Sequence, residues 1–93
     1  MTPLQKRIKF KRAKLGREGV WGHADTYPLV IDDRCRGKKE LEIYVHESLH
    51  YLFPKLTEEQ IIKKSILLTN TLWHEGFRKT DNDNNTPLQD GTL

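Results

Sequence analysis

Apolar and polar residues alternate along the first third of the chain. Within 7–15, Ile8 and Phe10 alternate with lysine, the period of two that is typical of a half-buried strand. The segment 20–27 predicts a second strand, and the short apolar run 29–31 predicts a third. We therefore expect a small sheet of about three strands in this part of the chain.

Glycine and proline punctuate these strands. Gly16 and Gly19 predict a turn after the first strand. Gly22 permits a bulge or a close approach of another part of the backbone within the second strand. Pro28 interrupts that strand and separates it from the third.

From about Lys39 the spacing of apolar residues changes to that of a helix. The positions that follow one helical face are Leu41, Val45, Leu49 and Leu52. Pro54 is expected to end this helix at or just before Phe53, because a residue that precedes proline avoids the helical region.

A second helix is expected to begin at Thr57. The spacing of Thr57 and Gln60 is that of a capping box, and Glu58 and Glu59 suit the positive end of the helix dipole. Gly76 is expected to end the helix. Its inner face is predicted to consist of Ile61, Ser65, Leu68 and Leu72. Because the break between the helices is short, we expect them to form an antiparallel hairpin.

Length and composition predict one small domain. The chain has 93 residues, of which 35% are hydrophobic and 31% charged. We place the domain at 1–79 and expect 80–93, rich in Asp, Asn and Thr, to be a disordered tail. No apolar run approaches the roughly 18 residues of a membrane span. The lone Cys35 excludes an intramolecular disulfide, so a cytoplasmic location without a membrane partner is expected.

The charges are distributed unevenly. Residues 1–17 carry seven basic side chains and no acid, whereas the remaining nine basic side chains are offset by all 13 acids. This basic arm can contact nucleic acid or an acidic partner. Alternatively, it is a solvated strand whose charges protect the exposed edge of a sheet.

The residues most suited to chemistry form an H-E-x-x-H pentad, His46 to His50, within the first helix. Four residues are a little over one helical turn, so both imidazoles project from one face and can meet one zinc ion. Glu47 lies about 100° further round the helix. It can therefore take a proton from a zinc-activated water without being a ligand itself.

A catalytic zinc site requires a third protein ligand. In an antiparallel hairpin the first turn of the second helix is level with His50, which makes Glu58 and Glu59 the candidates. Glu58 is favoured because it shares the inward row of the helix, although the helix dipole alone would explain both acids. His74 and Glu75 lie too far along the second helix and are expected to be exposed.

Other residues have weaker claims to a role in the site. Cys35 is expected to be a buried or unreactive thiol. His23 and Asp25 can reach the site, or orient a ligating imidazole, if their strand runs beside the pentad helix. Tyr27 and Tyr51, with His23, are candidates for stabilising an oxyanion.

Several stretches around the pentad resemble small zincin-like proteins encoded in bacteriophage genomes. The stretches are Trp21-Gly22-x-x-Asp25, Ile31-Asp32, Glu40 to His50, Leu56-Thr57-Glu58-Glu59 and Leu72-Trp73-His74-Glu75-Gly76-Phe77. The resemblance implies an α+β fold of minimal gluzincin type, with a short antiparallel sheet, an active-site helix and a glutamate-bearing helix. It also implies that His46, His50 and Glu58 bind zinc and that Glu47 is the general base.

The function expected on these grounds is zinc-dependent hydrolysis of peptide bonds. The substrate would be a peptide or protein that adds as a strand along 21–27. Two other functions stay open. The chain can be a non-catalytic module, such as a phage protein that acts on a host protein in the host cytoplasm. It can also be a nucleic-acid binder that uses the basic arm.

Overall fold

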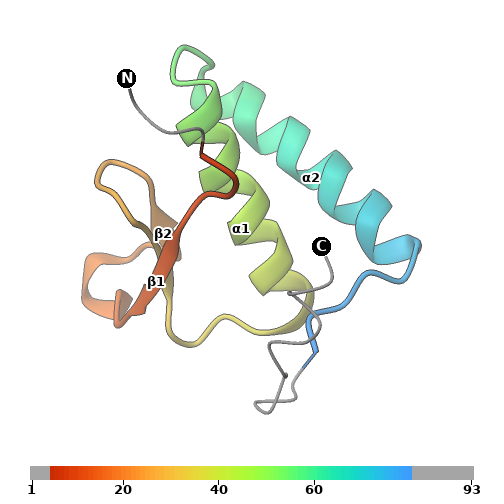
Figure 1. Cartoon of the computed structure of the whole chain (residues 1–93), viewed down its shortest axis with the longest axis horizontal. Helices are drawn as coiled ribbons and strands as arrows, with labels where there is room; N and C mark the ends of the chain where they lie inside the picture. Colours follow the sequence, from red (N-terminus) through yellow and green to blue (C-terminus); the bar gives the residue numbers. More distant parts are fainter. Residues whose placement is uncertain (1–4, 81–93) are drawn as a thin grey trace.

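Three short strands precede two long helices in the computed structural model, which describes residues 5–80 (Figure 1). The strands are β1 Phe10–Ala13, β2 Gly22–His23 and β3 Leu29–Asp32, with a 3-10 turn at Gly16–Glu18, and the helices are α1 Gly37–Leu52 and α2 Glu58–His74. The predicted α+β fold, with a small sheet followed by a helix pair, is confirmed. The tail predicted for 80–93 lies beyond the described residues from residue 81 onward.

The sheet is mixed, whereas an antiparallel sheet was expected. Its strand order is β1-β3-β2, in which β2 and β3 are antiparallel and β1 and β3 are parallel. The short connection between β2 and β3 makes them a hairpin. β1 pairs with the other edge of β3, and the chain between them is long enough to return to the same end of the sheet. Alternation along a strand predicts the strand but not the partner that it pairs with.

The basic arm forms one edge of this sheet. Lys9, Lys11 and Lys14 are exposed on or beside β1, which agrees with charges that solvate a sheet edge. Arg12 differs from them because its guanidinium turns inward and pairs with Glu40 of α1. The arm therefore also attaches the sheet to the start of α1.

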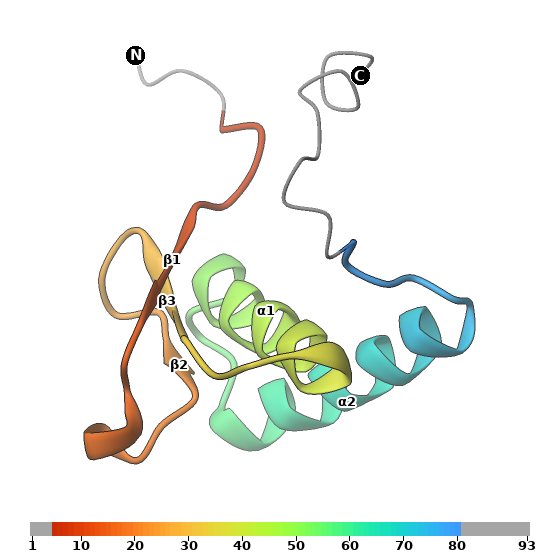
Figure 2. The same cartoon turned by 90° about the horizontal axis from the view of Figure 1, so that it is seen from below.

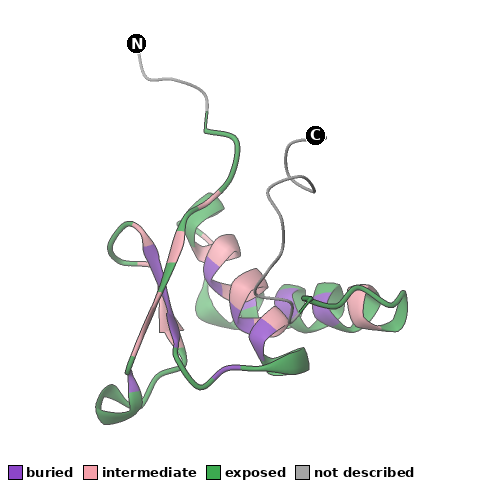
Figure 3. Ribbon diagram, turned by 60° about the horizontal axis from the view of Figure 1, so that its bottom comes forward, coloured by how far each residue is buried: buried purple, intermediate pink, exposed green. Residues whose placement is uncertain are grey.

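The core lies between β3 and α1. All four residues of β3 are buried because it is the central strand (Figure 3). Ile31 packs with Cys35 and Ile43. Asp32 is also buried, and its carboxylate accepts hydrogen bonds from the Arg34 side chain and from the Leu15 backbone. The Arg34 hydrogen bonds lower the pKa of Asp32 to about 2. Within 5–80, neither helix is long and apolar enough to cross a membrane.

The two helices lie side by side as the expected antiparallel hairpin (Figure 2). α1 ends at Leu52, and α2 starts with the predicted capping box, in which Thr57 Oγ1 accepts from the Gln60 N–H at 3.2 Å.

One position on the inner face of α2 was predicted wrongly. The buried row is Ile61, Ser65 and Thr69, whereas Leu68 is 44% exposed. Residues four apart stack in one narrow row against α1, and Leu68 lies outside that row.

Candidate metal centre

His46 and His50 occupy adjacent turns on one face of α1. Their ring centroids are 4.9 Å apart, as the spacing of the pentad predicts. Both side chains are partly buried. The helix itself, rather than a loop, therefore fixes the separation of the two imidazoles.

Glu58, in the first turn of α2, completes the cluster. Its Oε1 lies 2.7 Å from Nε2 of His50, and its Oε2 lies 3.2 Å from Nε2 of His46. Glu59 is directed elsewhere, and its carboxylate pairs with Lys63 at 3.3 Å on the exposed side of α2. Of the two acids, the structure brings Glu58 to the histidines.

The cluster has the composition of a metal site. One ligand atom each from His46, His50 and Glu58 lies within 4.8 Å of the others, so the three can hold a metal ion. The donors are imidazole nitrogen and carboxylate oxygen, which suit divalent transition metals. Burial lowers the pKa of His46. Glu58 is exposed, so this side of the cluster is open to solvent.

Ser65 is a residue of this site that sequence reasoning did not single out for a role. Its hydroxyl donates to the Ile62 carbonyl at 3.0 Å and lies 3.5 Å from Nδ1 of His46. The hydroxyl can then only accept from an Nδ1–H, which directs Nε2 of His46 toward Glu58. The sequence feature that could have indicated this role is a polar side chain on the inner row of α2, seven residues after Glu58.

Glu47 lies beside the cluster and is not part of it. Its side chain is only 7% exposed, and burial raises its pKa. It lines the same depressions of the surface as His46 and Glu58. Glu47 therefore borders the surface on which a metal ion held by the two histidines and Glu58 would lie.

Gly22 allows β2 to approach α1 at this point. A Cβ atom at Gly22 would lie 2.8 Å from Ile43 Cγ2, 2.8 Å from the Val30 carbonyl oxygen and 3.2 Å from Glu47 Cγ. Only glycine fits in this space, so the close approach expected at Gly22 is confirmed. β2 is an edge strand of the sheet, and Gly22 and His23 line the same depression as Glu47.

Two shallow depressions meet at the cluster and share Gly22, His46, Glu47 and Glu58 in their lining. One, of about 420 Å³, extends toward His23 and Asp25. The other, of about 350 Å³, extends along the apolar side chains of Val20, Trp21 and Ile62. Together they form an open surface on both sides of the metal ligands.

The remaining candidates fall outside the metal cluster. His23 lines the depression, with Nδ1 2.8 Å from Oδ1 of Asp25, so Asp25 lies against His23 rather than a ligating imidazole. The hydroxyl of Tyr27 accepts from Gln5 and from the Lys9 backbone, and that of Tyr51 donates to Gln5. Neither tyrosine lines the two depressions.

The expectations for Cys35, His74 and Glu75 are confirmed. Cys35 is buried in the core, and burial raises its pKa. His74 and Glu75 are exposed at the far end of α2, and neither belongs to the metal cluster.

Comparisons of this chain with protein-family models, with curated proteins and with solved structures found no match.

Proposed function

We propose that this protein is a zinc-dependent peptidase. The observation that carries the proposal is the convergence of His46, His50 and Glu58 in a depression that the edge strand β2 also lines, with Glu47 buried beside them. The helix dipole accounts for an acid at Glu58, whereas the position of its carboxylate, 2.7 Å from His50 Nε2 and 3.2 Å from His46 Nε2, brings three metal-binding groups together.

The donor set favours zinc among the metals that bind nitrogen and oxygen. Two histidines and one glutamate are a ligand set of catalytic zinc sites, which keep one further position for water or substrate. The exposed side of Glu58 provides space for that position. Zinc bound in this way acts as a Lewis acid and makes water nucleophilic near neutral pH.

Glu47 would perform the proton transfers of the reaction. Its carboxylate would accept a proton from the water that attacks the carbonyl carbon, and would then donate it to the amide nitrogen as the carbon–nitrogen bond breaks. The products are one new carboxylate and one new amine. The position of β2 supports binding of the substrate as an extended strand, because β2 is an edge strand of the sheet formed by the described residues and lines the depression that contains Glu47.

Metal content and proteolysis test this proposal together. The full chain, purified without chelator, is expected to contain one zinc per molecule by elemental analysis and to cleave an unfolded protein substrate. Glu47→Gln should retain the zinc and lose cleavage, by about 100-fold or more. Glu58→Gln should lose the zinc, whereas the matched variant Glu59→Gln should keep both properties. If the protein binds zinc but shows no cleavage that Glu47→Gln abolishes, it is not a peptidase, and the result would indicate a non-catalytic module.

A further inference from the structure

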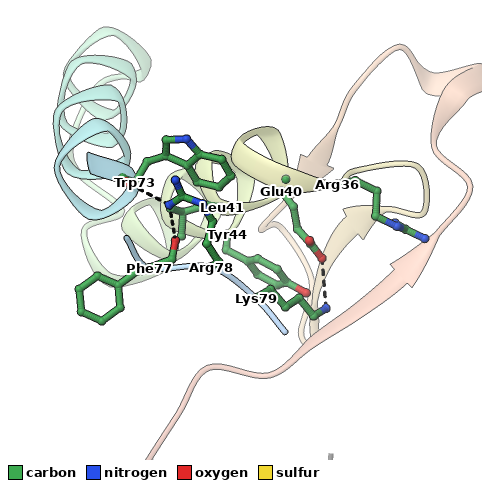
Figure 4. A pocket seen from close by; sticks show the side chains of 9 residues that line it. Arg36, Glu40, Leu41, Tyr44, Trp73, Phe77, Arg78 and Lys79 are labelled. Atoms are coloured by element: carbon green, nitrogen blue, oxygen red, sulfur yellow. Dashed lines mark hydrogen bonds and ion pairs between the residues drawn. The ribbon is translucent and has the colours of Figure 1, made fainter. Parts of the chain in front are cut away.

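A larger groove lies at the other end of α1, away from the metal centre. It has a volume of about 940 Å³ and lies between the start of α1, the end of α2 and the segment 77–79 (Figure 4). Its lining shares no residue with the two depressions around the metal ligands. The groove is therefore a separate surface that the peptidase proposal does not use.

The groove is positively charged. Arg36, Arg78 and Lys79 line it, and Glu40 is the acid among the lining residues. Glu40 is 5% exposed and is already paired with both Arg12 and Lys79. Arg12, which is not a lining residue, offsets the charge of Glu40, so Arg36, Arg78 and Lys79 leave the groove with a net positive charge.

Aromatic side chains alternate with these cations. Phe77 is 63% exposed, and Trp73 carries the Arg78 guanidinium 3.5 Å over its ring. In Figure 4 Trp73 and Phe77 lie at one end of the groove and Arg36 lies at the other. Tyr44 and Lys79 lie between them. Flat apolar surfaces and positive charges therefore follow one another along its length.

We propose that this groove binds single-stranded nucleic acid. Proteins that bind single strands combine a cationic groove, which follows the phosphates, with aromatic side chains on which bases stack. Charge complementarity alone would also suit an acidic peptide. The exposed ring of Phe77 and the Arg78–Trp73 pair favour bases, because they offer stacking surfaces that a run of carboxylates does not use.

Binding of a fluorescein-labelled 15-nucleotide oligothymidine to the full chain, followed by anisotropy, tests the proposal. The double variant Arg78→Gln/Lys79→Gln should bind more weakly and should lower the slope of log Kd against log salt concentration by about 1.4, since each phosphate contact contributes about 0.7. Lys63→Gln/Lys64→Gln removes the same charge from an exposed part of α2 and should leave the slope unchanged.

Phe77→Ala tests stacking separately from charge. Loss of one stacked base should weaken binding at least about fivefold, whereas Leu67→Ala, at an equally exposed apolar position of α2, should leave it unchanged. Circular dichroism confirms that each variant is folded. The proposal is overturned if the oligonucleotide does not bind, if the Lys63/Lys64 pair matters as much as Arg78/Lys79, or if a polyglutamate peptide competes as well as the unlabelled oligonucleotide.

Discussion

The two ends of α1 carry surfaces of opposite character. Its C-terminal half presents His46 and His50 to a carboxylate of α2, and its N-terminal half, with the segment 77–79, forms a cationic aromatic groove. The metal centre depends on a local pattern within one helix, completed by a residue that follows a short loop. The groove instead combines residues about forty positions apart. The comparison teaches that a motif reveals a site only when most of its members are close in sequence.

Glu58→Gln is expected to have the largest effect, and it tests whether the metal centre and the groove are independent. Zinc at 100 times its Kd should stabilise the native protein against unfolding by about 2.7 kcal/mol. The variant should lose this stabilisation, because it lacks the carboxylate that faces both histidines. Thermal unfolding with and without zinc measures the change, with Glu59→Gln as the control. Oligonucleotide binding should be the same in both variants, and a loss of binding confined to Glu58→Gln would show that the two surfaces are not independent.

Gly22→Val should affect stability and the metal centre, and leave the groove unchanged. The added side chain would collide with Ile43 and with the Val30 carbonyl, so β2 must move away from α1. We expect a loss of about 1–3 kcal/mol in the free energy of unfolding, typical of overpacking, together with weaker zinc binding. Gly16→Ala is the control, since its Cβ would come no closer than 3.6 Å to another atom. If Gly22→Val unfolds in urea at the same concentration as the wild type, the approach of β2 to α1 at Gly22 is not tight.

Glu40→Gln should change the groove in two opposite ways. Removing the buried carboxylate leaves Arg12 and Lys79 without their shared partner, which should cost about 1–3 kcal/mol of stability. The same change raises the positive charge of the groove and should tighten oligonucleotide binding by a few-fold at low salt. Urea unfolding and anisotropy measure the two effects. Weaker binding by a folded Glu40→Gln variant would contradict the electrostatic account of this groove.

Ser65→Ala should have a smaller effect, confined to the metal. The hydroxyl near Nδ1 of His46 orients that imidazole, and loss of such a partner commonly weakens metal binding by about tenfold. Competition with a zinc-sensitive dye measures the affinity, and Thr71→Ala on the exposed side of α2 is the matched control. Equal zinc affinity in the serine variant and the wild type would assign Ser65 to packing only.

The last effect appears only at acid pH and concerns the scaffold that both surfaces share. The pKa of Asp32 is about 2 in the folded protein and 3.8 in its ordinary state. A lowered folded pKa contributes stability above the ordinary value, so this contribution should be lost as pH falls from about 4 to about 2. Urea unfolding across this range should show the loss in the wild type, and Asp32→Asn should show less of it. Identical pH profiles would mean that Asp32 does not titrate in this range.

The sequence predicts the elements better than their arrangement. The capping box of Thr57 and Gln60 and the stop before Pro54 place both helix boundaries, because they are local backbone effects. The parallel pairing of β1 with β3 could not be predicted, since alternation does not specify a partner strand. Spacings of three and four residues both fit one helical face, so the pattern placed Leu68 after Ser65 on the inner face, whereas the buried residue there is Thr69.

In the candidate site too, features set by nearby residues are easier to predict than those set by the packing of distant segments. His46 and His50 are four residues apart, and Glu58 becomes available once a short antiparallel hairpin is assumed, so all three could be chosen before the structure was known. The role of Ser65 depends on the rotation of α2 about its axis, which periodicity gives only approximately. The groove requires the path of 77–79 across α1, and no local pattern encodes that path.

The position of Glu58 next to the loop has a mechanical consequence. A cation held by His46, His50 and Glu58 would cross-link the two helices near residues 53–57, where they are already joined. Their opposite ends, which frame the groove, would keep the freedom to separate. Zinc would then slow hydrogen exchange most strongly around the loop and leave the mouth of the groove able to widen for its ligand.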